Sequence, residues 1–250
     1  MSKKLACGAD RILLDVKAGC GAFMKTAADA ENLARLMVRI GALAKRPTVA
    51  LITGMDAPLG MAVGNALELK EAFDTLKGRG PKDLEELCIE LAAQMLVLAG
   101  LGDADGCRVK ARDALRTGAA LVKMQQLIEA QHGDPRVTED YSLLASARYT
   151  RTVLSPSGGF VRAMKADMFG RASVALGAGR ETKDSDIDLA AGIVLCKKPG
   201  DAVSQSEQLY ILHASEEKRL DEAVVILSDA VEIGDEPPEP SPLILGFIGA

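Results

Sequence analysis

The chain contains no tryptophan, only two histidines and no long apolar run. His132 and His213 lack cysteine or carboxylate partners at ligand spacing, so a histidine-rich metal centre is excluded. A membrane-spanning helix needs about 20 consecutive apolar residues, and no segment approaches that length. The first residues also lack the apolar core of a secretion signal. We therefore expect no membrane partner.

The chain has few cysteines, and no part of it concentrates positive or negative charge. Five cysteines are an odd number, and none are spaced as Cys-x-x-Cys. We interpret them as reduced thiols of a cytoplasmic protein, because disulfides persist in oxidising compartments. The net charge is −5 and the basic residues are scattered among acidic ones, which argues against a nucleic-acid partner. The cysteines are Cys7, Cys20, Cys88, Cys107 and Cys196.

What the chain does have is an α/β pattern near its start. Residues 11–17 (RILLDVK) predict a parallel strand covered on both faces, and the glycines of 19–21 allow a sharp turn after it. Residues 48–53 (TVALIT) predict a second strand, and a helix with its N-cap at Thr26 connects the two. Ligands of such sheets bind beyond the carboxyl ends of the strands, so we expect the turn and the loop 55–60 to border a site.

The rest of the chain suggests a second, smaller unit. Apolar residues at helical spacing predict helices over 83–98, 103–117 and 119–132, and short strands separated by turns follow. Hydrophobic residues make up 48% of the 250 positions, enough for two domains. We predict an α/β fold in which residues 1–156 form a partial parallel sheet with flanking helices. Residues 157–250 are predicted to form a smaller α+β domain with an extended tail and a loosely docked apolar end.

Three stretches give the chain a family resemblance. They are KKLACGADRILLDVKAGCGAFMK from residue 3, TGMDAPLGMAVGNALELKEA from residue 53 and GRASVALGAGRETKDSDIDLAAGI from residue 170. In this order and at these separations they resemble the pyrimidine-nucleoside phosphorylase and thymidine phosphorylase family, over nearly the whole chain. The resemblance implies a phosphorolytic pentosyltransferase, a glycosyltransferase that converts a pyrimidine nucleoside and phosphate to the free base and (deoxy)ribose 1-phosphate.

The same resemblance implies an architecture and a cellular setting. Family members have a larger α/β domain and a C-terminal hammerhead-type α+β portion, and they work as cytoplasmic homodimers in pyrimidine nucleoside salvage. Their active cleft closes by hinge motion. These properties are expectations for the present chain.

Five residues match positions with known roles in that family. Lys3 matches a lysine that hydrogen-bonds a carbonyl oxygen of the pyrimidine, where an ammonium group would stabilise negative charge on the departing base. Phe23 matches a wall of the base pocket. The carbonyl oxygens of Leu59 and Ala62 and the carboxylate of Glu71 match a monovalent-cation site, taken as potassium, and oxygen ligands suit such a hard cation.

Other family elements have no counterpart in this sequence. These are the phosphate-binding loop, the base-binding arginine and serine, and the histidine near the base, all of which belong to an N-terminal portion of the family. We therefore expect the chain to lack that portion, to contain no catalytic residue and to be inactive alone. The preference between thymidine and uridine stays open.

Alternative interpretations stay open as well. The chain could be a non-catalytic interaction module, or a subunit that a separate N-terminal chain completes. A carrier module over residues 159–233 is a weaker idea, because Lys165 leads into helical sequence and not to a hairpin tip. Asp15 and Lys17 could form an acid/base pair, although a role in orienting the loop after the strand is favoured.

Overall fold

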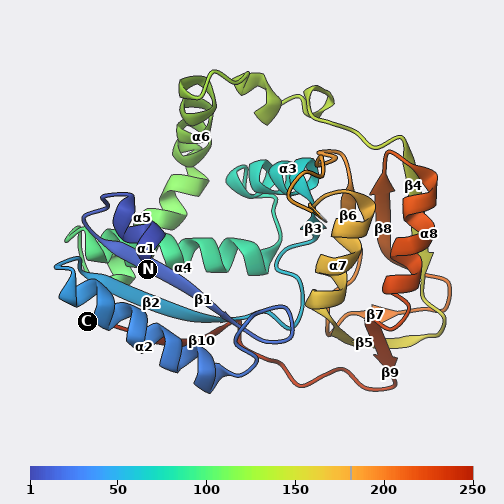
Figure 1. Cartoon of the computed structure of the whole chain (residues 1–250), viewed down its shortest axis with the longest axis horizontal. Helices are drawn as coiled ribbons and strands as arrows, with labels where there is room; N and C mark the ends of the chain where they lie inside the picture. Colours follow the sequence, from blue (N-terminus) through green and yellow to red (C-terminus); the bar gives the residue numbers. More distant parts are fainter. Residues whose placement is uncertain (181, 250) are drawn as a thin grey trace.

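The computed structural model describes residues 1–180 and 182–249 (Figure 1). It confirms the α/β class. The helices are α1 (Ser2–Ala6), α2 (Ala27–Leu43), α3 (Asn65–Leu76), α4 (Lys82–Leu98), α5 (Ala104–Arg116), α6 (Ala119–Ala130), α7 (Ala166–Leu176) and α8 (Glu217–Ile226), with short 3₁₀ helices η1 (Pro135–Thr138) and η2 (Tyr141–Leu143). The strands are β1 (Ile12–Ala18), β2 (Thr48–Gly54), β3 (Ala62–Val63), β4 (Tyr149–Leu154), β5 (Gly159–Met164), β6 (Gly192–Leu195), β7 (Ala202–Val203), β8 (Gln208–Ala214), β9 (Val231–Gly234) and β10 (Ile244–Ile248).

The first sheet has the strand order β1-β2-β10. Strands β1 and β2 are parallel over their full lengths, as the sequence predicts, and helix α2 covers one face of the pair. Burial alternates along β1, whereas the first six residues of β2 are all buried. Every second residue of β1 packs against α2. The other face of β1 is covered in part, because α4 contacts the strand and Leu13 and Lys17 are half-buried while Asp15 is exposed.

Helix α2 begins where the sequence predicts. Thr26 has an extended backbone, and its Oγ1 accepts a hydrogen bond of 3.1 Å from the Asp29 backbone N–H. The same hydroxyl donates to the Asp29 carboxylate at 2.7 Å, so both side chains close the first turn. Such an N-cap satisfies one of the otherwise unpaired amides of the first turn.

The apolar end of the chain is part of the first sheet. We expected a loosely docked tail, but β10 pairs antiparallel to β2, with Phe247 opposite Leu51, and makes the sheet mixed. The pairing occupies the edge of β2 that β1 leaves free, and Ile248 packs against the core under α2. Residues 244–248 form a short apolar run without alternation, and periodicity alone does not assign such a run to a strand.

The second half of the chain is built on two antiparallel sheets, in the orders β3-β6-β8-β4 and β7-β5-β9. Their core includes Phe169 of α7, which meets Tyr210 of β8 edge to face with ring centroids 5.4 Å apart. Strand β3 pairs with β6, and β4 pairs with β8, so hydrogen bonds cross the predicted boundary at residue 156 in both cases. The division into 1–156 and 157–250 stays a prediction.

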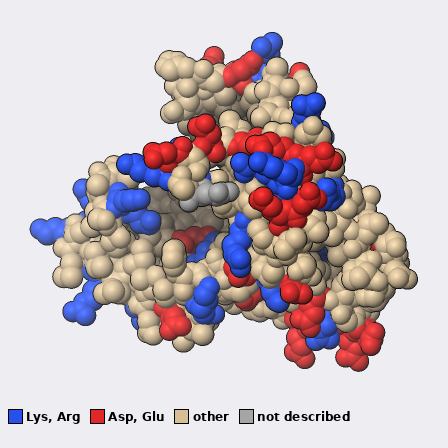
Figure 2. Space-filling view, turned by 45° about the vertical axis from the view of Figure 1, so that its right-hand side comes forward, with Lys and Arg blue, Asp and Glu red and all other residues tan. Residues whose placement is uncertain are grey.

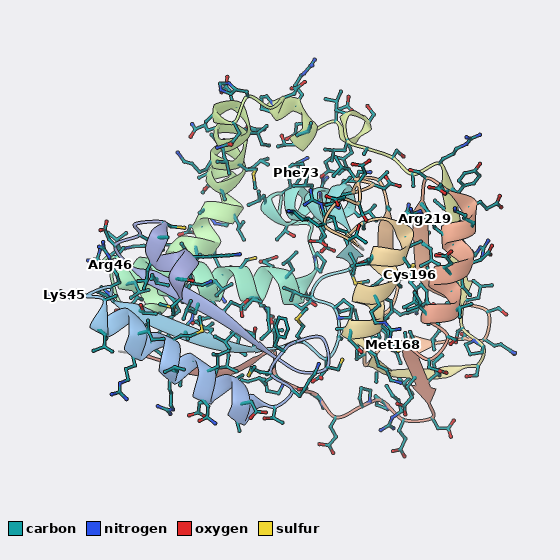
Figure 3. All side chains as sticks on the ribbon, viewed as in Figure 1. Lys45, Arg46, Phe73, Met168, Cys196 and Arg219 are labelled. Carbon is teal, nitrogen blue, oxygen red and sulfur yellow. The ribbon has the colours of Figure 1, made fainter. Side chains whose placement is uncertain are left out.

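In Figure 1, α3 lies between the two groups of strands, α4 and α5 lie beside the first sheet, and α6 projects away from both groups. The buried Phe73 of α3, labelled in Figure 3, has its ring centroid 6.3 Å from that of Tyr141. The hydroxyl of Tyr141 donates to Asp74 at 2.8 Å and ties η2 to α3. Within residues 1–180 and 182–249, no helix combines the length and apolar character that crossing a membrane requires.

Candidate functional site

The turn after β1 and the loop after β2 pack directly on each other. Gly19 has a φ of +130°, and a Cβ there would lie 2.8 Å from the backbone nitrogen of Asp56. The Cys20 N–H donates to Asp56 Oδ1 at 2.8 Å, and the Gly21 N–H donates to the Met55 carbonyl oxygen at 2.9 Å. The two loops at the carboxyl ends of the parallel strands therefore form one surface, as the sequence predicts.

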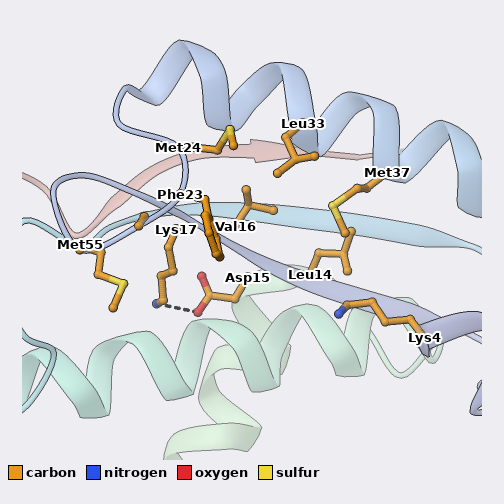
Figure 4. Close-up of a pocket in the computed structure, with 12 residues that line it drawn as sticks. Lys4, Leu14, Asp15, Val16, Lys17, Phe23, Met24, Leu33, Met37 and Met55 are labelled. Atoms are coloured by element: carbon orange, nitrogen blue, oxygen red, sulfur yellow. Dashed lines mark ion pairs between the residues drawn. The ribbon is translucent and has the colours of Figure 1, made fainter. Parts of the chain in front are cut away.

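A cavity of about 350 Å³ lies beside this surface (Figure 4). Phe23, whose side chain is 99% exposed, forms part of its wall. The remaining wall is mostly apolar and comes from β1, α2 and the two loops, with Lys4, Asp15 and Lys17 as its charged members. An apolar cavity of this size with a few polar groups is typical of a small-molecule site.

Asp15 fixes Lys17 at the cavity. The Lys17 ammonium lies 2.7 Å from Asp15 Oδ2, and the buried Thr53 donates from Oγ1 to Asp15 Oδ1 at 2.5 Å (Figure 4). Both carboxylate oxygens thus have partners, one on β1 and one on β2. This geometry favours the orienting role of the pair over that of a free acid and base.

Lys3 lies in α1 with an exposed side chain, and its backbone carbonyl accepts a hydrogen bond from the Cys7 N–H at 3.2 Å. The neighbouring Lys4, and not Lys3, lines the cavity and extends towards it in Figure 4. The role assigned to Lys3 by resemblance stays a prediction. Lys4 and Lys17 are cavity residues that the resemblance did not single out.

The candidate cation site is centred on Glu71 of α3. Its Oε1 accepts a hydrogen bond of 2.6 Å from the Met61 N–H. Burial raises the pKa of Glu71 above its ordinary value, as does the charge of Asp83, while the N–H groups of Met61 and Ala62 act in the opposite direction. A Cβ on Gly60 would lie 2.2 Å from Glu71 Oε2, so only glycine lets the loop rest on this carboxylate.

Oxygen atoms at this point fit a hard monovalent cation. Ala62 and Glu71 line the same cavity of about 440 Å³, and Leu59 lies three residues before Ala62 in the loop. Among the described residues, no hydrogen-bond donor reaches the Leu59 carbonyl oxygen. No three His, Cys, Asp or Glu side chains gather as a metal site in the described part of the chain, so any cation here would depend on backbone carbonyls and one carboxylate.

Lys198 is a further residue at this loop, and sequence reasoning missed it. Its ammonium group donates to the carbonyl oxygens of Pro58 and of Gly60, the latter at 2.8 Å, and lies 2.9 Å from Asp83 Oδ2. The contact to Pro58 joins residues 140 positions apart, and residue spacing in a single sequence does not reveal a contact over such a separation.

Figure 2 shows that charged side chains of both signs gather near the middle of one face, beside a hollow.

Two family models match this chain. The model described as "Glycosyl transferase family, a/b domain" matches residues 1–121, and "Pyrimidine nucleoside phosphorylase C-terminal domain" matches residues 160–234. The first match contains β1, β2, both loops and the candidate cation site, and the second contains most of the antiparallel sheets. The fold of the chain, the geometry of the site and the two model matches together indicate the class of the α/β glycosyl transferases.

Proteins of similar sequence narrow the assignment from this class to one family within it. A protein named pyrimidine-nucleoside phosphorylase from Bacillus subtilis (strain 168) is 48% identical over 241 residues, which are 96% of this chain and 55% of that relative. Proteins of the same name from Staphylococcus aureus strains USA300 and COL are 48% identical over 242 residues, 96% of this chain and 56% of each relative. The two model matches and these relatives support membership of the pyrimidine-nucleoside phosphorylase family, and the chain spans a little over half the length of these relatives.

Proposed function

We propose that this chain acts in the phosphorolysis of pyrimidine nucleosides, in which phosphate replaces the base and leaves (deoxy)ribose 1-phosphate. The observation that carries the proposal is the cavity at the carboxyl end of β1, walled by Phe23 and bearing two lysines. It lies in a chain that is 48% identical, over 96% of its length, to proteins named for this activity.

The charges at the cavity suit the chemistry of base departure. When the glycosidic bond breaks, negative charge develops on the pyrimidine ring, and nearby cations stabilise that charge. Lys17, oriented by Asp15, and Lys4 provide such cations at the cavity, and we propose that Lys3 contacts a carbonyl oxygen of the base. Phe23 provides an aromatic surface against which a flat ring can stack.

We further propose that the carbonyl oxygens of Leu59 and Ala62 and the carboxylate of Glu71 hold a potassium ion. The support is the half-buried carboxylate and the Leu59 carbonyl oxygen described above. A bound cation there would neutralise this carboxylate and hold the loop in place. From the resemblance, we also propose a homodimer in the cytoplasm, with phosphate as the second substrate.

Base binding tests the proposal on the 250-residue chain itself. We would measure binding of uracil and thymine by ligand-observed NMR, with adenine as the control ligand. We expect uracil or thymine to bind and adenine not to bind. Phe23→Ala should weaken binding, whereas Phe247→Ala, which alters a second exposed phenylalanine on β10 that does not line the cavity, should not.

Turnover is tested separately, by phosphate-dependent release of uracil from uridine and of thymine from thymidine, with inosine as the control nucleoside. Because the phosphate-binding elements have no counterpart in this sequence, we expect no release by the 250-residue chain without an added N-terminal chain. Release from the pyrimidine nucleosides but not from inosine would show that this chain holds phosphate by itself. Equal binding of uracil and adenine, or binding that Phe23→Ala leaves unchanged, would overturn the assignment of the base site.

A further inference from the structure

The ammonium group of Lys198 is enclosed by acceptors. An ammonium has three donors, and here the acceptors are the carbonyl oxygens of Pro58 and Gly60 and the carboxylate of Asp83. The Lys198 side chain is only 22% exposed. A lysine with all three donors in use and little contact with water is held in one geometry, unlike an ordinary surface lysine.

Lys198 comes from the turn after β6, so it reaches the loop from the C-terminal half of the chain. A second bond runs in parallel, since the Leu195 N–H donates to the Met61 carbonyl oxygen at 2.6 Å. Asp83, in the first turn of α4, completes the cluster because its Oδ2 also accepts from the Gly60 N–H at 3.1 Å. The loop 58–61 is thereby fixed between β6 and α4.

We propose that Lys198 is a positioning residue for the cation site, a fixed ammonium group that holds the loop 58–60 so that the Leu59 and Ala62 carbonyl oxygens can accept a potassium ion beside Glu71. The inference rests on the cation site proposed above. It assigns to the C-terminal half of the chain a part in forming a site whose ligands all lie in the N-terminal half.

Charge balance supports the same role. Glu71 and Asp83 are two carboxylates that hold the same loop, Glu71 through the Met61 N–H at 2.6 Å and Asp83 through the Gly60 N–H at 3.1 Å. By pairing with Asp83 at 2.9 Å, Lys198 neutralises one carboxylate and leaves the other to the free cation. Outer-shell partners of this kind orient the groups that contact a metal ion.

The test compares Lys198→Met with Lys197→Met. Lys197 is a matched control because it lies in the same turn and is 18% exposed, and its contacts, Ala202 at 2.8 Å and Glu207 at 2.5 Å, lie in the C-terminal half of the chain. Thermal unfolding midpoints of the 250-residue chain are measured against potassium chloride, with choline chloride at equal ionic strength as the reference. Ligand binding to the folded state raises the midpoint, so the potassium-specific increment reports affinity.

We expect wild type and Lys197→Met to gain the same potassium-specific increment. Lys198→Met should need a potassium concentration on the order of 10–100 times higher for that increment, the loss typical of outer-shell variants. A general loss of stability would lower the midpoint equally in both salts and is thereby separated from a loss of positioning. Lys198→Met with the wild-type potassium response would overturn the inference.

Glu71→Ala separates the two proposals, because it removes a ligand and should abolish the increment. A wild-type chain without any potassium-specific increment would overturn the cation site, and the role of Lys198 with it.

Hydrogen exchange without potassium provides a second measurement. The amides of Gly60 and Met61 should exchange faster in Lys198→Met than in wild type, and unchanged exchange would count against positioning. If Lys198→Met does not fold, Asp83→Asn, which removes the negative charge of one of the three acceptor groups, should show a smaller shift in the same direction.

Discussion

Thr53 and Asp15 share a hydrogen bond of 2.5 Å that links the side chains of the parallel strands β1 and β2. Thr53 is fully buried, and Asp15 also pairs with Lys17, which is register partner to Thr53 in the sheet. A hydroxyl in the core thus determines, through one carboxylate, where a cation lies at the candidate base site.

Removing the Thr53 hydroxyl should therefore destabilise the fold. Thr53→Val keeps the shape of the side chain, and loss of a hydrogen bond to a charged group should cost about 1.5–3 kcal/mol. Urea unfolding measures the loss, and Thr53→Ser, which keeps the hydroxyl, is the control. In a double-mutant cycle with Asp15→Ala, which removes the acceptor, we expect a coupling energy of about 1 kcal/mol or more. Strictly additive effects would show that the bond contributes nothing.

Gly19→Ala should be more damaging than Gly8→Ala. Both glycines have positive φ values, +130° and +72°, but a Cβ at Gly8 would meet nothing within 4 Å, whereas one at Gly19 would collide with Asp56. We expect a loss of about 1 kcal/mol for Gly8→Ala from backbone strain alone. Gly19→Ala should add the cost of displacing the loop, and it should weaken uracil binding as well. Equal losses in chemical unfolding would contradict the close packing of the two loops.

Thr26→Ala should lower the free energy of unfolding by about 1 kcal/mol, the usual cost of losing a helix N-cap. The reason is that the Asp29 N–H loses its acceptor and the Asp29 carboxylate loses a donor. Thr26→Ser keeps the oxygen and should retain most of the stability. Denaturant titration followed by circular dichroism measures both variants, and an unchanged midpoint for Thr26→Ala would contradict the cap.

His213 should make stability depend on pH. Burial, and next the positive charge of Lys70, lower the pKa of His213 below its ordinary value of 6.5. The unfolded chain then binds a proton at a higher pH than the folded chain does, so stability is lost as the pH falls from 6.5 towards the folded-state pKa. The slope from one such group is at most about 1.4 kcal/mol per pH unit. His213→Gln should flatten the dependence in this range, and an identical slope in the variant would rule out His213 as its source.

Local patterns in the sequence predicted the elements that depend on neighbours along the chain. The parallel pair β1 and β2, the cap at Thr26 and the positive φ of Gly19 all follow from residues close to each feature. The expectation that two loops meet at the carboxyl ends of the strands was confirmed for the same reason, because parallel strands fix which ends lie together.

Features that depend on distant partners could not be predicted. Nothing near Lys198 indicates that Pro58 and Gly60 will enclose its ammonium group, and nothing near Ile244 indicates that β2 offers a free edge. Lys4 lines the cavity only because of the direction in which the short α1 presents it. In each case the partner lies far away in the sequence, and one sequence alone carries no record of such a pairing.

The return of β10 to β2 also has a consequence for biosynthesis. The ribosome makes residues 48–54 early, but their sheet acquires its third strand only when residues 244–248 have emerged. Until then one edge of β2 is open to other strands, and such edges invite pairing between nascent chains. Because closing the sheet requires contact across nearly the whole chain, this step should be slow, and a chaperone would be most useful just before it.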